Sequence, residues 1–328
     1  MTYVQNGVAG NIYAGGVLRF SAKTDAIFLW GFSQATQIRL TIDGVQYPPQ
    51  TLGTVGDLSY GWRTVITGLA LSATYHTFEV MVDSNAPTTT SGGSQCIIYQ
   101  VLVQGFTGIN PTPLAAKNQL AVYGDSISAP GYWPTAYGAL ESWCHGYLMA
   151  RNRGLGYVGC GIPATTVSST YSGATSGESR TADLTRLGTA VTHCVVHYGI
   201  NDVHFSVDGA TFQTAYEAMM TALLAGCTAC QFYCLGVLPQ NAITFGLDAA
   251  EIAAQNARIV AAIAALGSSR VLYIDPTNWP LNPPSGAGAW ALFVDGGVHP
   301  NAGGYGVISQ LLEATLSGTF PSYSAALP

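Results

Sequence analysis

The chain has 328 residues, of which 48% are hydrophobic and only 9% are charged, and its formal net charge is −6. Disordered chains combine low hydrophobicity with high charge, so this composition excludes a disordered protein. A negative chain with so few basic residues does not neutralise the phosphates of a nucleic acid, and its length is enough for two domains of ordinary size.

Residues 1–112 show the alternation of apolar and polar side chains that is typical of β-strands. Residues 38–42 and 78–82 have a period of two, and Asp43-Gly44 predicts a hairpin turn between two alternating segments. Turn-rich stretches separate further strand candidates at residues 17–20, 26–30, 64–66 and 97–103. Because no amphipathic helix is evident, we predict an all-β sandwich domain over residues 1–112.

After the Pro-containing segment 110–113, short apolar runs alternate with helical patterns. The runs cover residues 119–123, 157–161, 194–198, 231–237 and 271–274. Residues 248–266 form the clearest helix, with capping-box residues at its start and Gly267 after its end. Alternating strands and helices predict a parallel sheet covered on both faces over residues 113–328, with the active site at the carboxyl ends of the strands.

The chain contains seven cysteines, an odd number, which leaves at least one free thiol. Cys227 and Cys230 form a Cys-x-x-Cys motif, but neither a second pair nor a nearby histidine completes a zinc site. We therefore interpret most cysteines as small buried hydrophobic residues, with one disulfide as an alternative.

The sequence contains no apolar stretch of about 18 residues, so we expect no membrane insertion. The first residues show no basic segment followed by an apolar core, so no signal peptide is visible. The composition nevertheless favours a secreted protein whose signal peptide is absent from this sequence, with a cytoplasmic protein as the alternative.

Polar motifs follow two of the predicted strands and precede the last helix. Gly124-Asp125-Ser126 ends the first parallel strand, Gly199-Ile200-Asn201-Asp202 follows the third, and the segment 295–299 precedes Pro300. Taken alone, each motif is typical of an ordinary turn or helix cap. Because the carboxyl ends of parallel strands share one edge of the sheet, we expect the three motifs to meet there.

This combination resembles the SGNH, or GDSL-type, hydrolase family, which has Gly-Asp-Ser after the first strand, Gly-x-Asn-Asp after the third and His-Pro near the C-terminus. The resemblance covers residues 117–320. It implies a flavodoxin-like five-stranded parallel sheet with helices on both faces, the SGNH hydrolase fold. It also implies a serine esterase that forms an acyl-enzyme intermediate and requires no metal or other cofactor.

The chemistry of such an enzyme accounts for the residue types. A serine hydroxyl attacks an ester only when a base removes its proton, so Ser126 is the expected nucleophile and His299 the expected base. The negative charge on the tetrahedral intermediate needs fixed hydrogen-bond donors. By the resemblance, these are the N–H of Ser126, the side-chain amide of Asn201 and a backbone N–H in the loop after the second strand.

The sequence departs from the family pattern at two places. The family usually has two residues between its acid and its histidine, whereas three residues separate Asp295 from His299. We favour Asp295 as the third triad residue; the alternative is a dyad of Ser126 and His299, with a backbone carbonyl orienting the imidazole. In the loop after the second strand, Ala164 stands where the donor glycine is usual, so we name Ala164 first and Gly161 second as the backbone donor.

Turn and strand motifs of the N-terminal region, among them residues 42–44, 67–69 and 76–80, resemble the jelly-roll domain of carbohydrate esterase family 2. This resemblance implies a secreted enzyme that removes O-acetyl groups from carbohydrate. The side chains expected in the substrate pocket are Trp133, Asp202, His204, Trp279 and Trp290. The alternatives are a carboxylesterase or arylesterase for short acyl esters, and a polysaccharide-binding protein with an inactive hydrolase domain.

Overall fold

The computed structural model describes residues 3–5, 17–24, 26–33, 37–48, 50–51, 61–66, 74–84, 96–104, 108–109, 119–128, 145–153, 155–239, 249–281, 292–293 and 298–316. The described elements belong to two compact units, one containing β1 to β10 and the other β11 to α8. The domain boundary predicted between residues 112 and 113 lies outside the described residues.

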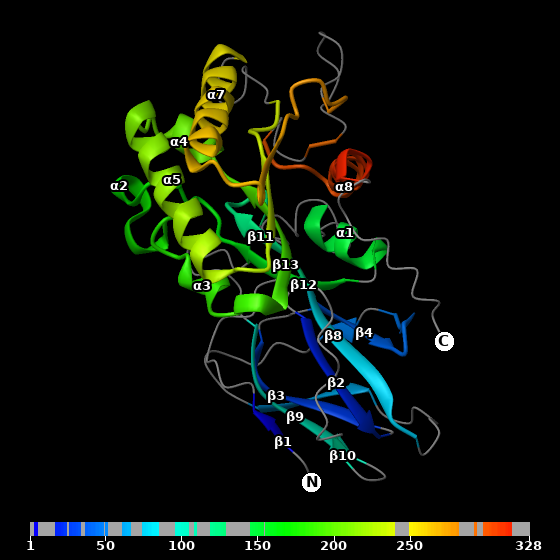
Figure 1. Cartoon of the computed structure of the whole chain (residues 1–328). Coiled ribbons are helices and arrows are strands. Elements are labelled where there is room, and N and C mark those ends of the chain that lie inside the picture. Colours follow the sequence, from blue (N-terminus) through cyan, green and yellow to red (C-terminus); the bar gives the residue numbers. More distant parts are fainter. Residues whose placement is uncertain are drawn as a thin grey trace. The chain divides into compact units, whose positions relative to one another are not determined.

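The first unit contains two antiparallel sheets, drawn in blue to cyan in Figure 1. Their strand orders are β1-β9-β3-β7 and β10-β2-β8-β4-β5, with β6 paired to β4. The strands are β1 Tyr3–Gln5, β2 Val17–Lys23, β3 Ala26–Ser33, β4 Gln37–Ile42, β5 Val45–Gln46, β6 Gln50–Thr51, β7 Gly61–Ile66, β8 His76–Ser84, β9 Cys96–Gln104 and β10 Gly108–Ile109. The predicted all-β region is confirmed.

Apolar side chains of the central strands form the interior of this unit. Phe20 and Phe78 are cross-strand partners in β2 and β8, both are buried, and their rings stack 5.3 Å apart. The predicted hairpin turn joins β4 to β5: Asp43 and Gly44 have φ values of 49° and 85°. Two successive residues with positive φ make the tight turn whose twist suits a hairpin, which is why Asp-Gly occurs there.

The second unit is built on a five-stranded parallel sheet with the order β12-β11-β13-β14-β15. Its strands are β11 Gln119–Gly124, β12 Gly156–Gly161, β13 Val191–His197, β14 Gln231–Leu235 and β15 Val271–Ile274. The side chains from residue 193 to residue 197 are all buried, as expected for a central parallel strand with both faces covered. This sheet confirms the predicted flavodoxin-like fold.

Helices cover both faces of the sheet: α1 packs with α8 on one face, and α5 packs with α7 on the other (Figure 1). The helices are α1 His145–Asn152, α2 Ser169–Ser172, α3 Ala182–Thr185, α4 Ile200–His204, α5 Gly209–Gly226, α7 Ala249–Leu266 and α8 Ala302–Leu316, with short 3₁₀ turns at η1 Gly173–Thr175 and η2 Gly188–Ala190.

Helix α7 occupies the position of the helix that the sequence predicts most clearly. It ends before Gly267, which has the left-handed φ of 59° typical of a helix terminus. Among the described helices, α7 alone is long and apolar enough to cross a membrane by length and composition. Its Ile252, Ile259 and Ala262 are buried, and it packs on α5 and β15, so in this structure α7 is a helix that covers the sheet.

The cysteines whose side chains the structure describes are all free thiols. Four are buried and Cys160 is half-buried, which agrees with their interpretation as small hydrophobic residues; the four are Cys194, Cys227, Cys230 and Cys234. The side chains of Cys96 and Cys144 lie outside the described part of the chain.

Candidate active site

Ser126 lies in a tight turn, residues 124–128, at the carboxyl end of β11. Asp125 closes this turn, because its Oδ1 accepts the N–H of Ile127 at 3.0 Å. A Cβ at Gly124 would lie 2.3 Å from the Ser128 Oγ and 2.4 Å from a carbonyl oxygen of β13, so only glycine fits there. The Gly-Asp-Ser sequence therefore follows from the packing of the turn, and the Ser126 side chain is 5% exposed.

His299 reaches Ser126 because α8 is attached to the same turn. Its Nε2 lies 2.8 Å from the Ser126 Oγ, although 173 residues separate the two along the chain. Asn301 caps α8 with its Oδ1, and Tyr305 in the first turn of α8 donates its hydroxyl to the carbonyl of Ile127 at 2.9 Å. These bonds hold the imidazole beside the hydroxyl, at the distance a base needs to take the serine proton.

Asn201 stands at the start of α4 and faces the loop that follows β12, residues 162–168, which we call the β12 loop. Its Nδ2 donates to the carbonyl oxygen of Thr165 at 2.9 Å. This bond orients the amide and uses one of its two N–H groups. The arrangement therefore holds a side-chain donor at the carboxyl edge of the sheet.

Ala164 lies in the β12 loop with a φ of 58°, an unusual left-handed conformation for a residue other than glycine. The N–H of Ile162 donates to the carbonyl of Gly124 at 3.0 Å, whereas no hydrogen bond in the described part of the chain uses the N–H of Ala164. Gly161 is the buried last residue of β12 and pairs with Gly124. The two predicted backbone donors, Ala164 and Gly161, therefore both lie at the carboxyl end of β12.

Asp202 supports the β12 loop from inside the protein. Both of its carboxylate oxygens lie 3.1 Å from the N–H of Val167, and the N–H of Ser168 is a further donor. The side chain is 0% exposed, and this burial raises the pKa of Asp202 to about 7, although the backbone donors act in the opposite direction. Asp202, predicted in the substrate pocket, lies beneath the β12 loop in the structure.

Asp125 is a second buried carboxyl at this edge of the sheet. Burial raises the pKa of Asp125 to about 7, the bond from Ile127 lowers it, and the negative charge of Asp202 raises it further. Among the described residues, none is hydrogen-bonded to its Oδ2. Neither carboxyl is hydrogen-bonded to His299, so neither takes the position expected of Asp295.

Of the other predicted site residues, the structure describes two. Asp295, Trp133 and Trp290 lie outside the described residues. Trp279 is half-buried and packs against the core of the second unit. His204 is exposed at the end of α4.

The ring of His204 borders an aromatic pair that the sequence analysis did not select. It lies edge-on to Phe205 at 5.0 Å, and Phe205 stacks on Tyr171 at 4.9 Å. Tyr171 is 57% exposed. The one sequence signal for this pair is the spacing of Asn201 in α4 and Phe205, the C-cap residue of α4, whose N–H bonds to the carbonyl of Asn201.

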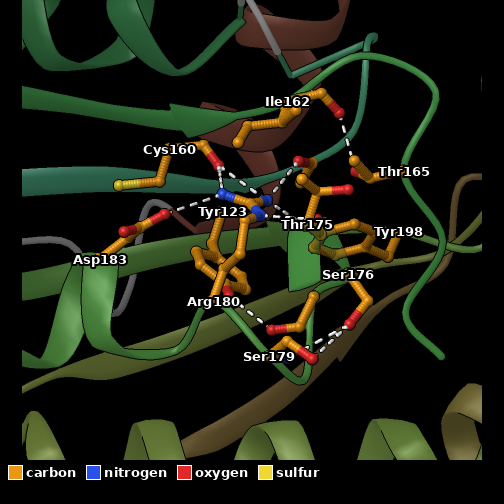
Figure 2. Close-up of polar contacts among 12 residues, drawn as sticks. Tyr123, Cys160, Ile162, Thr165, Thr175, Ser176, Ser179, Arg180, Asp183 and Tyr198 are labelled. Carbon is orange, nitrogen blue, oxygen red and sulfur yellow. Dashed lines mark hydrogen bonds and ion pairs between the residues drawn. The ribbon is translucent and has the colours of Figure 1, made fainter. Parts of the chain in front are cut away.

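A polar cluster centred on Arg180 also lies at the ends of β11, β12 and β13, and the sequence analysis did not select it (Figure 2). No periodic pattern or motif marks Arg180, because its partners come from distant segments of the chain.

A serine hydrogen-bonded to a histidine at the carboxyl edge of a five-stranded parallel sheet defines the class of protein, a serine ester hydrolase with the SGNH fold. The model of the GDSL-like lipase/acylhydrolase family matches residues 122–307, more than half of the chain. The chain therefore belongs to the GDSL-like lipase/acylhydrolase family. No curated protein sequence matches it.

Several solved structures share the fold over almost the whole chain. A family two carbohydrate esterase from Cellvibrio japonicus has a TM-score of 0.66 and 16% identity, covering 96% of this chain and 96% of that one. A family two carbohydrate esterase from Clostridium thermocellum, in complex with cellohexaose, has a TM-score of 0.65 and 14% identity, covering 94% and 93%. An acetyl xylan esterase from the rumen bacterium Butyrivibrio proteoclasticus has a TM-score of 0.62 and 12% identity, covering 96% and 98%.

Proposed function

We propose that this protein hydrolyses short-chain acyl esters and that its substrates are O-acetyl groups on carbohydrate. The observation that carries the proposal is the 2.8 Å contact between the Ser126 Oγ and the His299 Nε2. The likeness to carbohydrate esterases over 94% or more of the chain supports a sugar as the alcohol part of the ester. The low charged fraction is consistent with an enzyme that acts outside the cell.

In the proposed mechanism, His299 takes the proton of the Ser126 hydroxyl while the Oγ attacks the ester carbonyl. The N–H of Ser126, the amide of Asn201 and the N–H of Ala164 stabilise the oxyanion, with the N–H of Gly161 as the alternative donor. The sugar hydroxyl leaves with the proton from His299. Water, deprotonated by His299, then attacks the acyl-enzyme and releases acetate. These steps need no metal or organic cofactor.

We further propose that Asp295 completes a triad by orienting His299 and stabilising the imidazolium. Asp295→Asn should then lower kcat by at least about two orders of magnitude with KM largely kept, because an amide supports the wrong tautomer. If Asp295→Asn keeps more than about a tenth of the activity, the site is the dyad of Ser126 and His299, with a backbone carbonyl orienting the ring.

The aromatic pair of exposed Tyr171 and half-buried Phe205 supports a sugar ring as ligand. Aromatic faces bury apolar surface while leaving the polar rim of a ligand in water, and this pair lies one helical turn from Asn201. Tyr171→Ala should therefore raise KM for acetylated xylan and leave KM for p-nitrophenyl acetate unchanged, because the small ester does not extend to the pair. An equal effect on both substrates would contradict this role.

The proposed function is tested with wild type and Ser126→Ala on p-nitrophenyl esters of increasing chain length and on acetylated xylan. We expect wild type to release acetate, to prefer acetyl over longer esters, and to be labelled at Ser126 by a fluorophosphonate. Ser126→Ala should retain less than about one part in a thousand of the activity. Hydrolysis of small esters without acetate release from xylan would favour the carboxylesterase alternative, and no hydrolysis at all would favour an inactive binding protein.

A further inference from the structure

The side chain of Arg180 reaches the ends of three neighbouring strands (Figure 2). Arg180 lies in the turn before α3 and is 7% exposed. Its guanidinium lies 3.5 Å from the carbonyl oxygen of Gly124 in β11 and 3.4 Å from that of Cys160 in β12, and it donates to the hydroxyl of Tyr198, just after β13. The Arg180 side chain thus contacts the point where each of these three strands ends and its loop towards the candidate site begins.

The contacts of Arg180 differ in strength. At 3.4 and 3.5 Å, the contacts with the strand carbonyls are longer than ordinary hydrogen bonds and act mainly through the attraction between a cation and carbonyl dipoles. On the other side, the carbonyl of Thr175 accepts from Nε at 2.8 Å, and the carboxylate of Asp183 accepts at 3.0 Å. These shorter bonds hold the guanidinium in place, and the Tyr198 hydroxyl is its main link to the site.

Tyr198 continues this link to the oxyanion donor. Its side chain is 1% exposed, its ring packs edge-on against Tyr123 at 5.7 Å, and its hydroxyl lies close to the side chain of Thr165, which donates to the carbonyl of Ile162 at 2.7 Å. The carbonyl of Thr165 in turn accepts the amide of Asn201. A continuous series of contacts therefore leads from Arg180 through Tyr198 and Thr165 to Asn201.

We propose that Arg180 and Tyr198 are positioning residues that hold the β12 loop and Asn201 in the geometry needed to bind the oxyanion. They act through Thr165 and Asn201 and do not touch the ester. The proposal rests on the proposed function, because it requires Asn201 to be an oxyanion donor. Donors of this kind stabilise a transition state only when they are placed to within a fraction of an ångström, and a displacement of about 1 Å costs about 10²-fold in rate.

The experiment compares Tyr198→Phe with Tyr123→Phe. Each variant loses one buried hydroxyl from the same pair of rings, but the hydroxyl of Tyr123 donates to the carbonyl of Gly177, whose N–H bonds to the carbonyl of Thr166 rather than to the Thr165 carbonyl that Asn201 binds. We expect Tyr198→Phe to lower kcat by about tenfold or more at unchanged KM, and Tyr123→Phe to change kcat by less than about threefold at a similar loss of melting temperature. Equal kcat values in the two variants would overturn the proposal for Tyr198.

A double-mutant cycle with Asn201→Ala separates positioning from general loosening of the fold. If Tyr198 acts through Asn201, adding Tyr198→Phe to Asn201→Ala should not lower kcat further. Multiplicative effects of the two substitutions would overturn the proposal. Arg180→Lys keeps the charge but not the planar fork, so its kcat should fall at least as far as that of Tyr198→Phe, and a wild-type kcat would overturn the role of Arg180.

Fluorophosphonate labelling of Ser126 and the activity of Ser126→Ala are measured in the same series. A fully active Ser126→Ala would contradict the proposed function and the positioning proposal together. An inactive Ser126→Ala combined with a fully active Tyr198→Phe would contradict the positioning proposal alone.

Discussion

Two groups of strand ends lie on the same edge of the parallel sheet, yet they are built differently. After β14, the buried side chain of Asn256 exchanges two hydrogen bonds with the backbone of Val237, at 2.7 and 3.2 Å. After β15, Asp275 closes a local turn by accepting the N–H of Thr277 at 2.9 Å. At each of these ends, one side chain bonds to backbone groups: the N–H and C=O of Val237 after β14, and the N–H of Thr277 after β15.

At the ends of β11, β12 and β13, Asp125 closes a local turn in the same way as Asp275, but other polar groups make longer-range bonds. Ser126 bonds to His299 and Asn201 to Thr165 across distant segments, and no group in the described part of the chain accepts the N–H of Ala164. The comparison teaches that a single side chain is enough to close a structural strand end. At a strand end that carries a catalytic site, residues distant in the sequence position the reacting side chains, and hydrogen-bond donors are kept for a ligand.

After Ser126→Ala, the largest expected loss of activity is that of Asn201→Ala. Asn201→Ala should lower kcat by about 10²–10³ with little change in KM, because the amide binds charge that exists only in the transition state. Steady-state kinetics on p-nitrophenyl acetate measure this. A large rise in KM at unchanged kcat would make Asn201 a group that binds the substrate in its ground state.

Asn256 is the matched control, since it is also an asparagine that bonds to a loop at this sheet edge. Asn256→Ala should lower the free energy of unfolding by about 3 kcal/mol, because the N–H and the C=O of buried Val237 both lose their partner. Its kcat should stay within about twofold of wild type. If urea unfolding shows no loss of stability while kcat falls, the distinction between the two groups of strand ends is wrong.

Asp125 makes the free energy of unfolding depend on pH. Its pKa of about 7 lies above the value of about 3.9 in an unfolded chain, so between these pH values the folded state keeps a proton that the unfolded state has released. Wild-type stability is therefore lost as pH rises from about 4 to about 7. Relative to wild type, Asp125→Asn should gain about 2 kcal/mol between pH 5 and pH 8 in urea unfolding.

Ser128→Ala is the control for this pH dependence, because it changes the same turn and removes no ionisable group. Its free energy of unfolding should differ from that of wild type by the same amount at both pH values. A constant difference for Asp125→Asn as well would show that the Asp125 carboxyl does not couple folding to pH.

The smallest effect concerns the backbone of Ala164. Its φ of 58° costs an L-residue about 1–2 kcal/mol, whereas glycine adopts it freely but loses more entropy on folding. Ala164→Gly should therefore stabilise the protein by less than about 1 kcal/mol and keep its activity. Gly267 has the same conformation at the end of α7 with open space around it, so Gly267→Ala should destabilise by about 1 kcal/mol. Thermal unfolding of both variants measures the opposite signs.

Much of the fold was predictable because its signals are local. The five apolar runs coincide with β11 to β15, and the predicted hairpin lies at Asp43 and Gly44. The meeting of Ser126 and His299 was predictable too, because parallel strands bring their carboxyl ends to one edge of the sheet. For Asp202 the sequence located the strand end correctly, but it did not show that the side chain turns inward to the backbone of Val167.

The sequence by itself determined the class of fold, the edge of the sheet that carries the site, and the residue types needed for ester hydrolysis. Periodicity, caps and turns depend on residues within a few positions of one another, and each can be recognised in a short segment. Only the tertiary structure decided which contacts hold the residues of the candidate site in place. Arg180 contacts groups 18, 20 and 56 residues away, and Asp202 bonds to a backbone N–H 35 residues away. Such contacts depend on how the whole chain folds around a buried charge, and no local pattern records them.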